Sequence, residues 1–291
     1  MWVFLFLALI TTLVPNDTFA RSIRITSNVP RNQKLLLSRD LQLLKTLSVE
    51  NPDSKLLEIM HTDAVDSGKL EGWLEDRVQY VVGESFKFNE ALFIAEPSYS
   101  YENLNDVPVF EKATKHTGGN SSAKVIMSNI GVSAYFKGKE QHTLSGLKIP
   151  GVDDVRMTSP RVGVVQIGEG LFYLFEKRLP KSPQDSMAKS LARLSTLFHE
   201  ARHSDGHGKS LGFFHAVCPE GHHLAGYSAC DRNLNGPYTV GALVQQLMTE
   251  SCDTCSVEEK EVLRLNYLDS FGRVIQETSS VDWDDRPEGS R

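Results

Sequence analysis

The chain has no excess of positive charge and no basic cluster. It holds 31 Lys and Arg against 37 Asp and Glu, which gives a formal net charge of −6, and its basic residues are dispersed. Binding to the phosphate backbone of nucleic acids needs a basic patch or stripe. We therefore expect no nucleic-acid partner.

Long apolar runs are also missing, apart from one at the start of the chain. Residues 1–14 are almost continuously apolar, contain no Lys or Arg and are too few to cross a bilayer comfortably. Thr18-Phe19-Ala20 then offers small residues at a cleavage position. This pattern predicts a signal peptide over residues 1–20, cleaved after Ala20. We expect an exported protein, periplasmic or secreted, without stable membrane insertion after the signal is removed.

Cysteine is scarce and confined to the C-terminal third, at Cys218, Cys230, Cys252 and Cys255. Cysteines of an exported chain are most often paired. Of the three possible connectivities, Cys218 with Cys230 and Cys252 with Cys255 is the simplest. A zinc site made of four thiolates is the alternative, and an oxidising compartment disfavours it.

Hydrophobic periodicity predicts an α+β fold. Helical spacing of apolar residues indicates helices over 33–47, 56–60, 70–78, 183–204, 239–250 and 258–268. Alternating or β-branched stretches indicate strands over 79–96, 123–136 and 161–175. Ser182-Pro183 is a favourable start for the fourth helix, as an N-cap followed by proline. We expect a helical or mixed N-terminal region over 21–110, a second region over 111–281, and a flexible tail over 282–291.

The most informative motif is His199-Glu200-Ala201-Arg202-His203, an HExxH pentapeptide near the end of the predicted 183–204 helix. A spacing of four residues places both imidazoles on one helix face, where they can bind one zinc ion. Glu200 is then placed to act as a general base on an attacking water.

Residues 160–255 resemble the zincin metallopeptidases, because a strand precedes the HExxH helix and a cysteine-bounded loop follows it. The resemblance implies a zincin-like catalytic region: a small sheet with an edge strand that binds extended substrate, the HExxH helix, a disulfide-braced loop and a second helix. Three positions depart from the usual pattern. Arg202 is charged, Asp205 stands where an apolar residue is usual, and Lys209 replaces the third histidine of metzincins.

The third metal ligand has three candidates downstream of the motif. His222 is preferred, because the predicted Cys218–Cys230 bridge would restrain the loop that carries it. Asp231 resembles the aspartate ligand of aspzincins, and Glu250 resembles the glutamate of gluzincins. The other nearby histidines are expected to be packed, exposed or too close in sequence: His207, His215 and His223.

A developing oxyanion needs a donor besides the metal. Tyr238, after Gly236-Pro237, is preferred, with Tyr227 and Arg202 as alternatives. Asp205 is a candidate acceptor for a ligating imidazole.

The sequence thus predicts an exported Zn²⁺-dependent metallohydrolase, a peptidase acting on peptides or proteins. Its metal ligands would be His199, His203 and His222, and its catalytic residues Glu200 and Tyr238. Two rivals remain: a noncatalytic exported protein with a structural zinc site, and a zinc-dependent cell-wall amidase. Glu200 separates the first rival from an enzyme, since a purely structural site does not need it.

Overall fold

The computed structural model describes residues 22–83, 85, 126–127, 149–152, 164–175, 178–203 and 215–275. Over these residues the chain has an α+β fold with six α-helices, small sheets and two disulfides, as the periodicity predicted. The predicted signal peptide, the boundary near residue 110, the 282–291 tail and the segment 204–214 lie outside the described residues. No described helix is long and apolar enough to cross a membrane.

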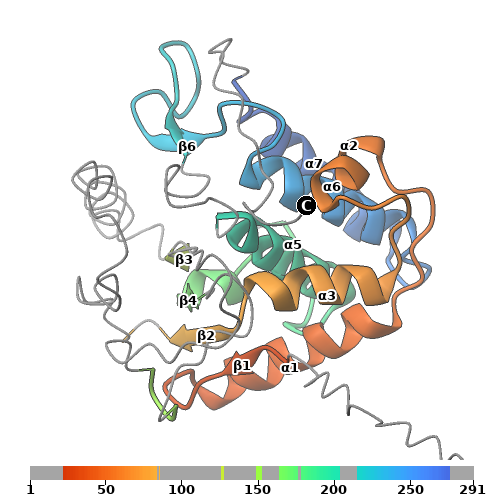
Figure 1. Ribbon diagram of the computed structural model, residues 1–291, viewed down its shortest axis with the longest axis vertical. Helices are drawn as coiled ribbons and strands as arrows, with labels where there is room; N and C mark the ends of the chain where they lie inside the picture. Colours follow the sequence, from red (N-terminus) through yellow and green to blue (C-terminus); the bar gives the residue numbers. More distant parts are fainter. Residues whose placement is uncertain are drawn as a thin grey trace, which may run out of the picture.

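A four-stranded sheet forms one side of the fold (Figure 1). Its strands, in sheet order, are β1 (Arg24–Ile25), β2 (Tyr80–Gly83), β4 (Val164–Ile167) and β3 (Ile126–Met127). The first three run parallel, and β3 pairs with β4 in the antiparallel direction as an edge strand. β4 is shorter than the strand or hairpin expected over 161–175. It ends before Gly168, and a 3₁₀-helix, η3 (Glu169–Phe172), follows.

Three helices precede or separate the first strands, in agreement with the periodicity. They are α1 (Arg31–Thr46), α2 (Ser54–Met60) and α3 (Ser67–Arg77). The side chains of Asp53 and Asp66 cap α2 and α3 by accepting hydrogen bonds from main-chain amides of their first turns. The predicted helical character of this part of the chain is therefore confirmed.

Helix α5 (Met187–His203) lies at the centre of the molecule. Figure 1 shows α1 and α3 on one side of it, with α6 (Pro237–Glu250) and α7 (Val257–Phe271) on the other, and α5 contacts all four. A helix surrounded in this way must bury polar residues that elsewhere would face water. Most of its side chains are indeed buried, including Arg193 and Arg202.

Two of the buried cationic side chains of α5 have hydrogen-bond partners within the fold. Arg193 donates to both carboxylate oxygens of Asp40 on α1, at 2.6 and 3.0 Å. It also donates to the main-chain carbonyl of Gln184 at 2.9 Å. Lys189 donates to the carbonyl of Ser182 at 2.8 Å. These contacts let charged groups occupy a helix that packs on every side.

The same contacts explain why α5 begins at Met187 and not at Pro183. The amide of Ser186 donates to the carbonyl of Pro183 at 3.0 Å, which closes a turn before the helix. The carbonyls of Ser182 and Gln184 are held by side chains of α5 itself. The segment 182–186 therefore forms turns that are hydrogen-bonded to α5 and is not the first turn of that helix.

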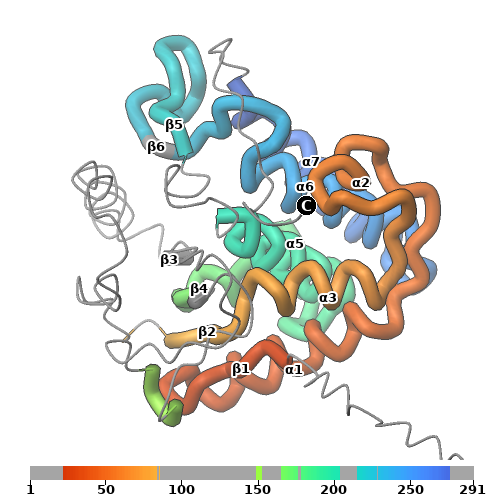
Figure 2. The backbone as a smooth tube through the Cα atoms, in the orientation of Figure 1, coloured from red at the N-terminus to blue at the C-terminus, as the bar shows by residue number. Residues whose placement is uncertain are grey.

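A two-stranded ribbon leads into the last two helices. Strands β5 (Ala216–Val217) and β6 (Ser228–Cys230) are antiparallel, and a disulfide joins Cys218 to Cys230. Figure 2 shows the ribbon extending beyond the helices before the chain turns into α6. A second disulfide, Cys252–Cys255, lies between α6 and α7. The predicted pairing is confirmed, and with no free cysteine the four-thiolate alternative fails.

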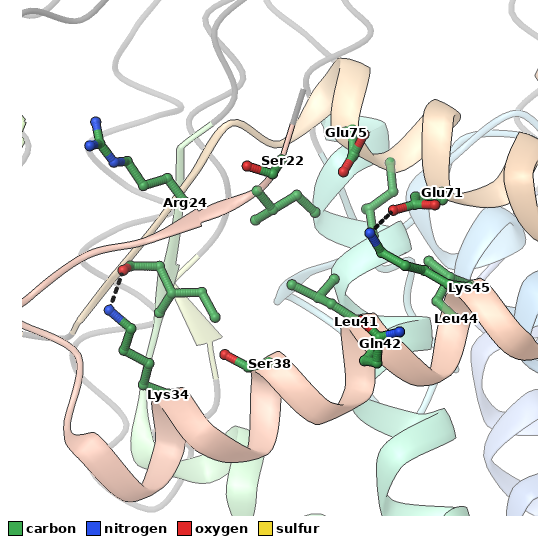
Figure 3. Close-up of a pocket in the computed structure, with 13 residues that line it drawn as sticks. Ser22, Arg24, Lys34, Ser38, Leu41, Gln42, Leu44, Lys45, Glu71 and Glu75 are labelled. Atoms are coloured by element: carbon green, nitrogen blue, oxygen red, sulfur yellow. Dashed lines mark hydrogen bonds and ion pairs between the residues drawn. The ribbon is translucent and has the colours of Figure 1, made fainter. Parts of the chain in front are cut away.

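β1, α1 and α3 surround a hollow of about 370 Å³ (Figure 3). Apolar side chains form much of its wall, and charged side chains stand around them. Lys45 pairs with Glu71 at 2.7 Å, and Lys34 donates to the carbonyl of Ile25 at 3.0 Å. Both lysines are thus engaged within the fold, and we assign no ligand to this hollow.

Candidate metal centre

Three imidazoles converge at the end of α5. His199 and His203 come from the HExxH motif, and His215 comes from the residue just before β5. One ring nitrogen of each lies within 4.8 Å of those of the other two. The spacing of His199 and His203 brings two of the imidazoles together on α5. The third imidazole, of His215, comes from twelve residues after His203.

Two ring nitrogens of the cluster face one another at close range. The Nε2 atoms of His199 and His215 are 3.2 Å apart. His215 turns its Nδ1 to the carboxylate of Asp231 at 2.9 Å, so we assign the proton to Nδ1. His199 hydrogen-bonds to the main chain of Pro237, a residue that offers only a carbonyl, so this ring also carries a proton away from His215. Two ring nitrogens at this distance share a cation, which can be a proton or a metal ion.

This donor set could hold a metal ion. Zinc–nitrogen bonds of about 2.0–2.1 Å at tetrahedral angles hold two nitrogens about 3.3 Å apart. The observed separation of 3.2 Å agrees with that value. Burial holds the pKa of His199 well below its ordinary value, and the neighbouring imidazoles lower it further. The ring is therefore neutral at neutral pH, which is the form that binds a metal.

Close packing of α6 on α5 fixes His199. A Cβ atom added at Gly241 would lie 3.1 Å from the carbonyl oxygen of Ser195 and 3.2 Å from the Cβ of His199. The Ser195 hydroxyl donates to the carbonyl of Gly241 at 2.9 Å across the same crossing. Glycine at this point lets the two helices approach directly beside the ligand.

The ribbon places His215 opposite Asp231. Ala216 pairs with Cys230 in the register of β5 and β6, so His215 and Asp231 are the residues just beyond that pair. The side chain of Asp231 is almost fully buried. Its Oδ1 faces His215, and its Oδ2 accepts from the amide of Tyr238 at 2.7 Å. Asp231 thus orients the imidazole from behind instead of offering a ligand itself.

Glycine is required next to this carboxylate. A Cβ atom at Gly236 would clash with the side chain of Asp231. Any larger residue would displace the carboxylate that orients His215. The turn before α6 therefore packs directly against the carboxylate that orients His215.

Glu200 and Tyr238 also border the cluster. A carboxylate oxygen of Glu200 lies 4.0 Å from Nε2 of His199, and the residue is buried. The ring of Tyr238 is 4.5 Å from that of His199 and 4.6 Å from that of His215, between ring centroids. Burial raises the pKa of Tyr238 to about 12, so its hydroxyl keeps its proton at neutral pH.

His222, the preferred third ligand from sequence, lies elsewhere. Its Nδ1 accepts from the amide of Leu224 at 3.0 Å, and its Nε2 is 2.9 Å from the carbonyl of Gly272. Both ring nitrogens are therefore used by the main chain. The ring also lies beside the Cys218–Cys230 disulfide, whose sulfurs are bonded to each other. The expected disulfide is present, and the histidine next to its strand that joins the cluster is His215.

The other candidates from sequence also differ from expectation. Glu250 is exposed at the far end of α6 and accepts a hydrogen bond from Gln246. Arg202 points its Nε to the carbonyl of Asn235 at 2.8 Å, and Tyr227 is exposed on the ribbon. Asp205, the candidate acceptor for a ligating imidazole, lies outside the described residues, as do His207 and Lys209.

Sequence reasoning passed over two residues of this centre. His215 was expected to be packed or exposed, although it stands among six histidines between residues 199 and 223 and directly precedes a strand. Arg273, which donates to the hydroxyl of Tyr238 at 2.7 Å, follows the last helix and carried no sequence signal.

No protein-family model, curated protein or solved structure matches this chain. Function is therefore inferred from its residues and their geometry.

Proposed function

We propose that this protein is an exported zinc-dependent hydrolase of peptide bonds, with His199, His203 and His215 as the metal ligands. One observation carries the proposal. Three imidazoles lie within mutual reach of one ion, and the buried carboxylate of Glu200 lies 4.0 Å from one of their nitrogens. A carboxylate beside the ligating nitrogens can serve as the general base for a water molecule on the metal.

Three histidine ligands are compatible with a catalytic site. Structural zinc sites are usually closed by four protein ligands, whereas catalytic sites have three and keep one position open. The described residues bring three ligating side chains together here. Asp231 supports His215 in the way that carboxylates support the histidine ligands of zinc enzymes.

The reaction follows from the groups around this site. Zinc would lower the pKa of a water molecule at the open position and polarise the substrate carbonyl. Glu200 would take a proton from the attacking water and deliver it to the leaving nitrogen. Tyr238 would donate a hydrogen bond to the carbonyl oxygen as negative charge develops there.

The zincin resemblance and the sheet favour a peptide substrate. β3 is an edge strand that pairs with β4, and β4 contacts the HExxH helix α5. An extended peptide can bind to an edge strand through main-chain hydrogen bonds. The two disulfides agree with an oxidising compartment and thus with export.

The test compares Glu200→Gln with the wild-type protein. We expect the wild type to contain one zinc ion by elemental analysis and to cleave a fluorogenic peptide library. Glu200→Gln should keep the zinc and the thermal stability but lose cleavage by at least about 10²-fold, as for loss of a general base. Glu250→Gln, at an exposed carboxylate of α6, is the matched control and should retain activity.

Two results would contradict the proposal. A wild-type protein purified without chelator that lacks stoichiometric zinc would exclude a zinc site. Unchanged cleavage by Glu200→Gln would leave the metal with a structural role only. A parallel assay on purified peptidoglycan distinguishes the cell-wall amidase, which would release wall fragments while leaving the peptide library intact.

A further inference from the structure

The segment that follows α7 returns to the metal centre and belongs to it. The carbonyl of Arg273 accepts from the amide of Asp231 at 2.8 Å, and the amide of Ile275 donates to the carbonyl of Asp231 at 2.9 Å. The carbonyl of Gly272 lies 2.9 Å from Nε2 of His222. The main chain of this segment therefore holds the residue that orients His215.

The side chain of Arg273 bonds to residues other than Asp231, which its main chain holds. One Nη atom donates to the hydroxyl oxygen of Tyr238 at 2.7 Å, and the other donates to Asp269 at 2.8 Å. The guanidinium carbon lies 4.7 Å from the centre of the Tyr238 ring. Asp269 belongs to α7, so the guanidinium is held from one side by that helix while it holds Tyr238 on the other.

The direction of the hydrogen bond between Arg273 and Tyr238 determines whether the Tyr238 hydroxyl is its donor or its acceptor. A guanidinium group has donors only, so Tyr238 must accept from Arg273. Its own proton cannot point to Arg273 and is left for another acceptor. The Tyr238 ring packs against His199 and His215, so the residue lies beside the candidate metal centre.

We propose that Arg273 is a positioning residue, which holds the hydroxyl of Tyr238 so that its proton is donated to the carbonyl oxygen of a bound peptide. This inference rests on the proposed function. It adds a residue outside the HExxH helix and the ribbon, and it gives the chain after α7 a part in the reaction. Asp269 sets the position of the guanidinium in turn.

The two contacts of Arg273 can be separated by mutation. Its main-chain carbonyl holds Asp231 whatever the side chain is, whereas the guanidinium alone holds Tyr238. Arg273→Met should therefore leave zinc affinity within about twofold of wild type while it impairs the chemical step. A residue needed only for the fold would lower zinc affinity, stability and activity together.

The experiment is a double-mutant cycle on the full-length zinc-loaded protein, with kcat and KM measured on one fluorogenic peptide. We expect Tyr238→Phe to lower kcat by about 10²-fold and Arg273→Met by at least about tenfold, with little change in KM. The double variant should be no slower than Tyr238→Phe, because the guanidinium acts through the hydroxyl. Arg273→Lys, which keeps one donor, should recover part of the loss.

A second readout needs no turnover. A phosphinic peptide, which mimics the tetrahedral transition state, should bind Arg273→Met more weakly by the same factor as the loss of kcat. Zinc affinity is measured in parallel by chelator competition. The matched control is Arg264→Met, at an exposed arginine of α7 paired with Glu261, and it should behave as wild type in every assay.

The possible failures are distinct. If the wild type cleaves peptides and Arg273→Met and Arg273→Lys both keep wild-type kcat, this inference fails while the proposed function stands. Additive losses in the double variant would also overturn it, since Arg273 would then act independently of Tyr238. A wild type that binds zinc but neither cleaves peptide nor binds the phosphinic peptide would overturn both.

Discussion

Asp231 supports the candidate metal centre through two contacts of its carboxylate. Its carboxylate faces Nδ1 of His215 at 2.9 Å and accepts from the amide of Tyr238 at 2.7 Å. The negative charge makes the imidazole a stronger donor to the metal and fixes its orientation.

We predict that Asp231→Asn lowers zinc affinity by about 10–100-fold, because it keeps the shape of the side chain and removes the charge. Competition with a chromophoric chelator measures the change. Asp253→Asn, at an exposed carboxylate, is the control and should bind zinc as the wild type does. Equal affinity for Asp231→Asn and wild type would show that the charge is not needed.

We predict opposite effects on zinc binding for substitutions of His215 and His222. His215→Ala removes one of the three converging imidazoles, so we expect loss of stoichiometric zinc and of hydrolysis. His222→Ala removes a ring that is bonded to main-chain groups at Leu224 and Gly272, so zinc should be retained. Elemental analysis of the two purified variants decides between them, and the reverse result would restore His222 as the ligand.

At the level of elements, the β5–β6 ribbon brings His215 to the two histidines of α5. The Cys218–Cys230 disulfide closes a loop with a sequence separation of 12 residues directly beside the Ala216–Cys230 pair. A loop of about that length is worth about 3 kcal/mol in the chain-entropy account. The bridge therefore limits the positions of both His215 and Asp231.

We predict that replacing Cys218 and Cys230 together by serine lowers the free energy of unfolding by about 3 kcal/mol. It should also weaken zinc binding, because His215 loses its restraint. Denaturant unfolding and chelator competition measure the two effects. The matched control replaces Cys252 and Cys255, whose bridge lies between α6 and α7, and should spare zinc affinity. Equal zinc affinity in both double variants would show that the ribbon does not depend on its bridge.

At the scale of the whole molecule, the N-terminal helices and the HExxH helix are joined by an ion pair. Asp40 of α1 and Arg193 of α5 have side chains that are each 1% exposed and lie 2.6 Å apart. Trp73 of α3 stacks on Phe198 of α5 with ring centroids 5.6 Å apart. The first helices are therefore part of the support for the site.

We predict that Asp40→Asn lowers the free energy of unfolding by about 3–5 kcal/mol, because it leaves the charge of Arg193 buried without its counter-ion. Thermal or denaturant unfolding measures the change. The neighbouring residue supplies the control: Arg39 pairs with Asp185 at the surface, and Asp185→Asn should have no measurable effect. Similar effects of the two substitutions would show that burial does not decide the strength of these pairs.

The sequence by itself determined the features that depend on neighbours along the chain. The spacing of four residues placed His199 and His203 on one helix face, with Glu200 beside them. The loop lengths between cysteines indicated the two disulfides, and helical periodicity located the three N-terminal helices within a few residues. Each of these features depends on residues that are close together along the chain, so a short stretch of sequence is enough to predict it.

Which third histidine lies beside His199 and His203 depends on the tertiary structure. His215 joins it because the register of the ribbon sets it opposite Asp231, and His222 is kept out because the loop turns its ring to main-chain groups. Arg273 reaches Tyr238 only because the chain after α7 returns to pair with Asp231. These contacts join residues that are far apart along the chain, and packing and strand register, not spacing, set which of them meet.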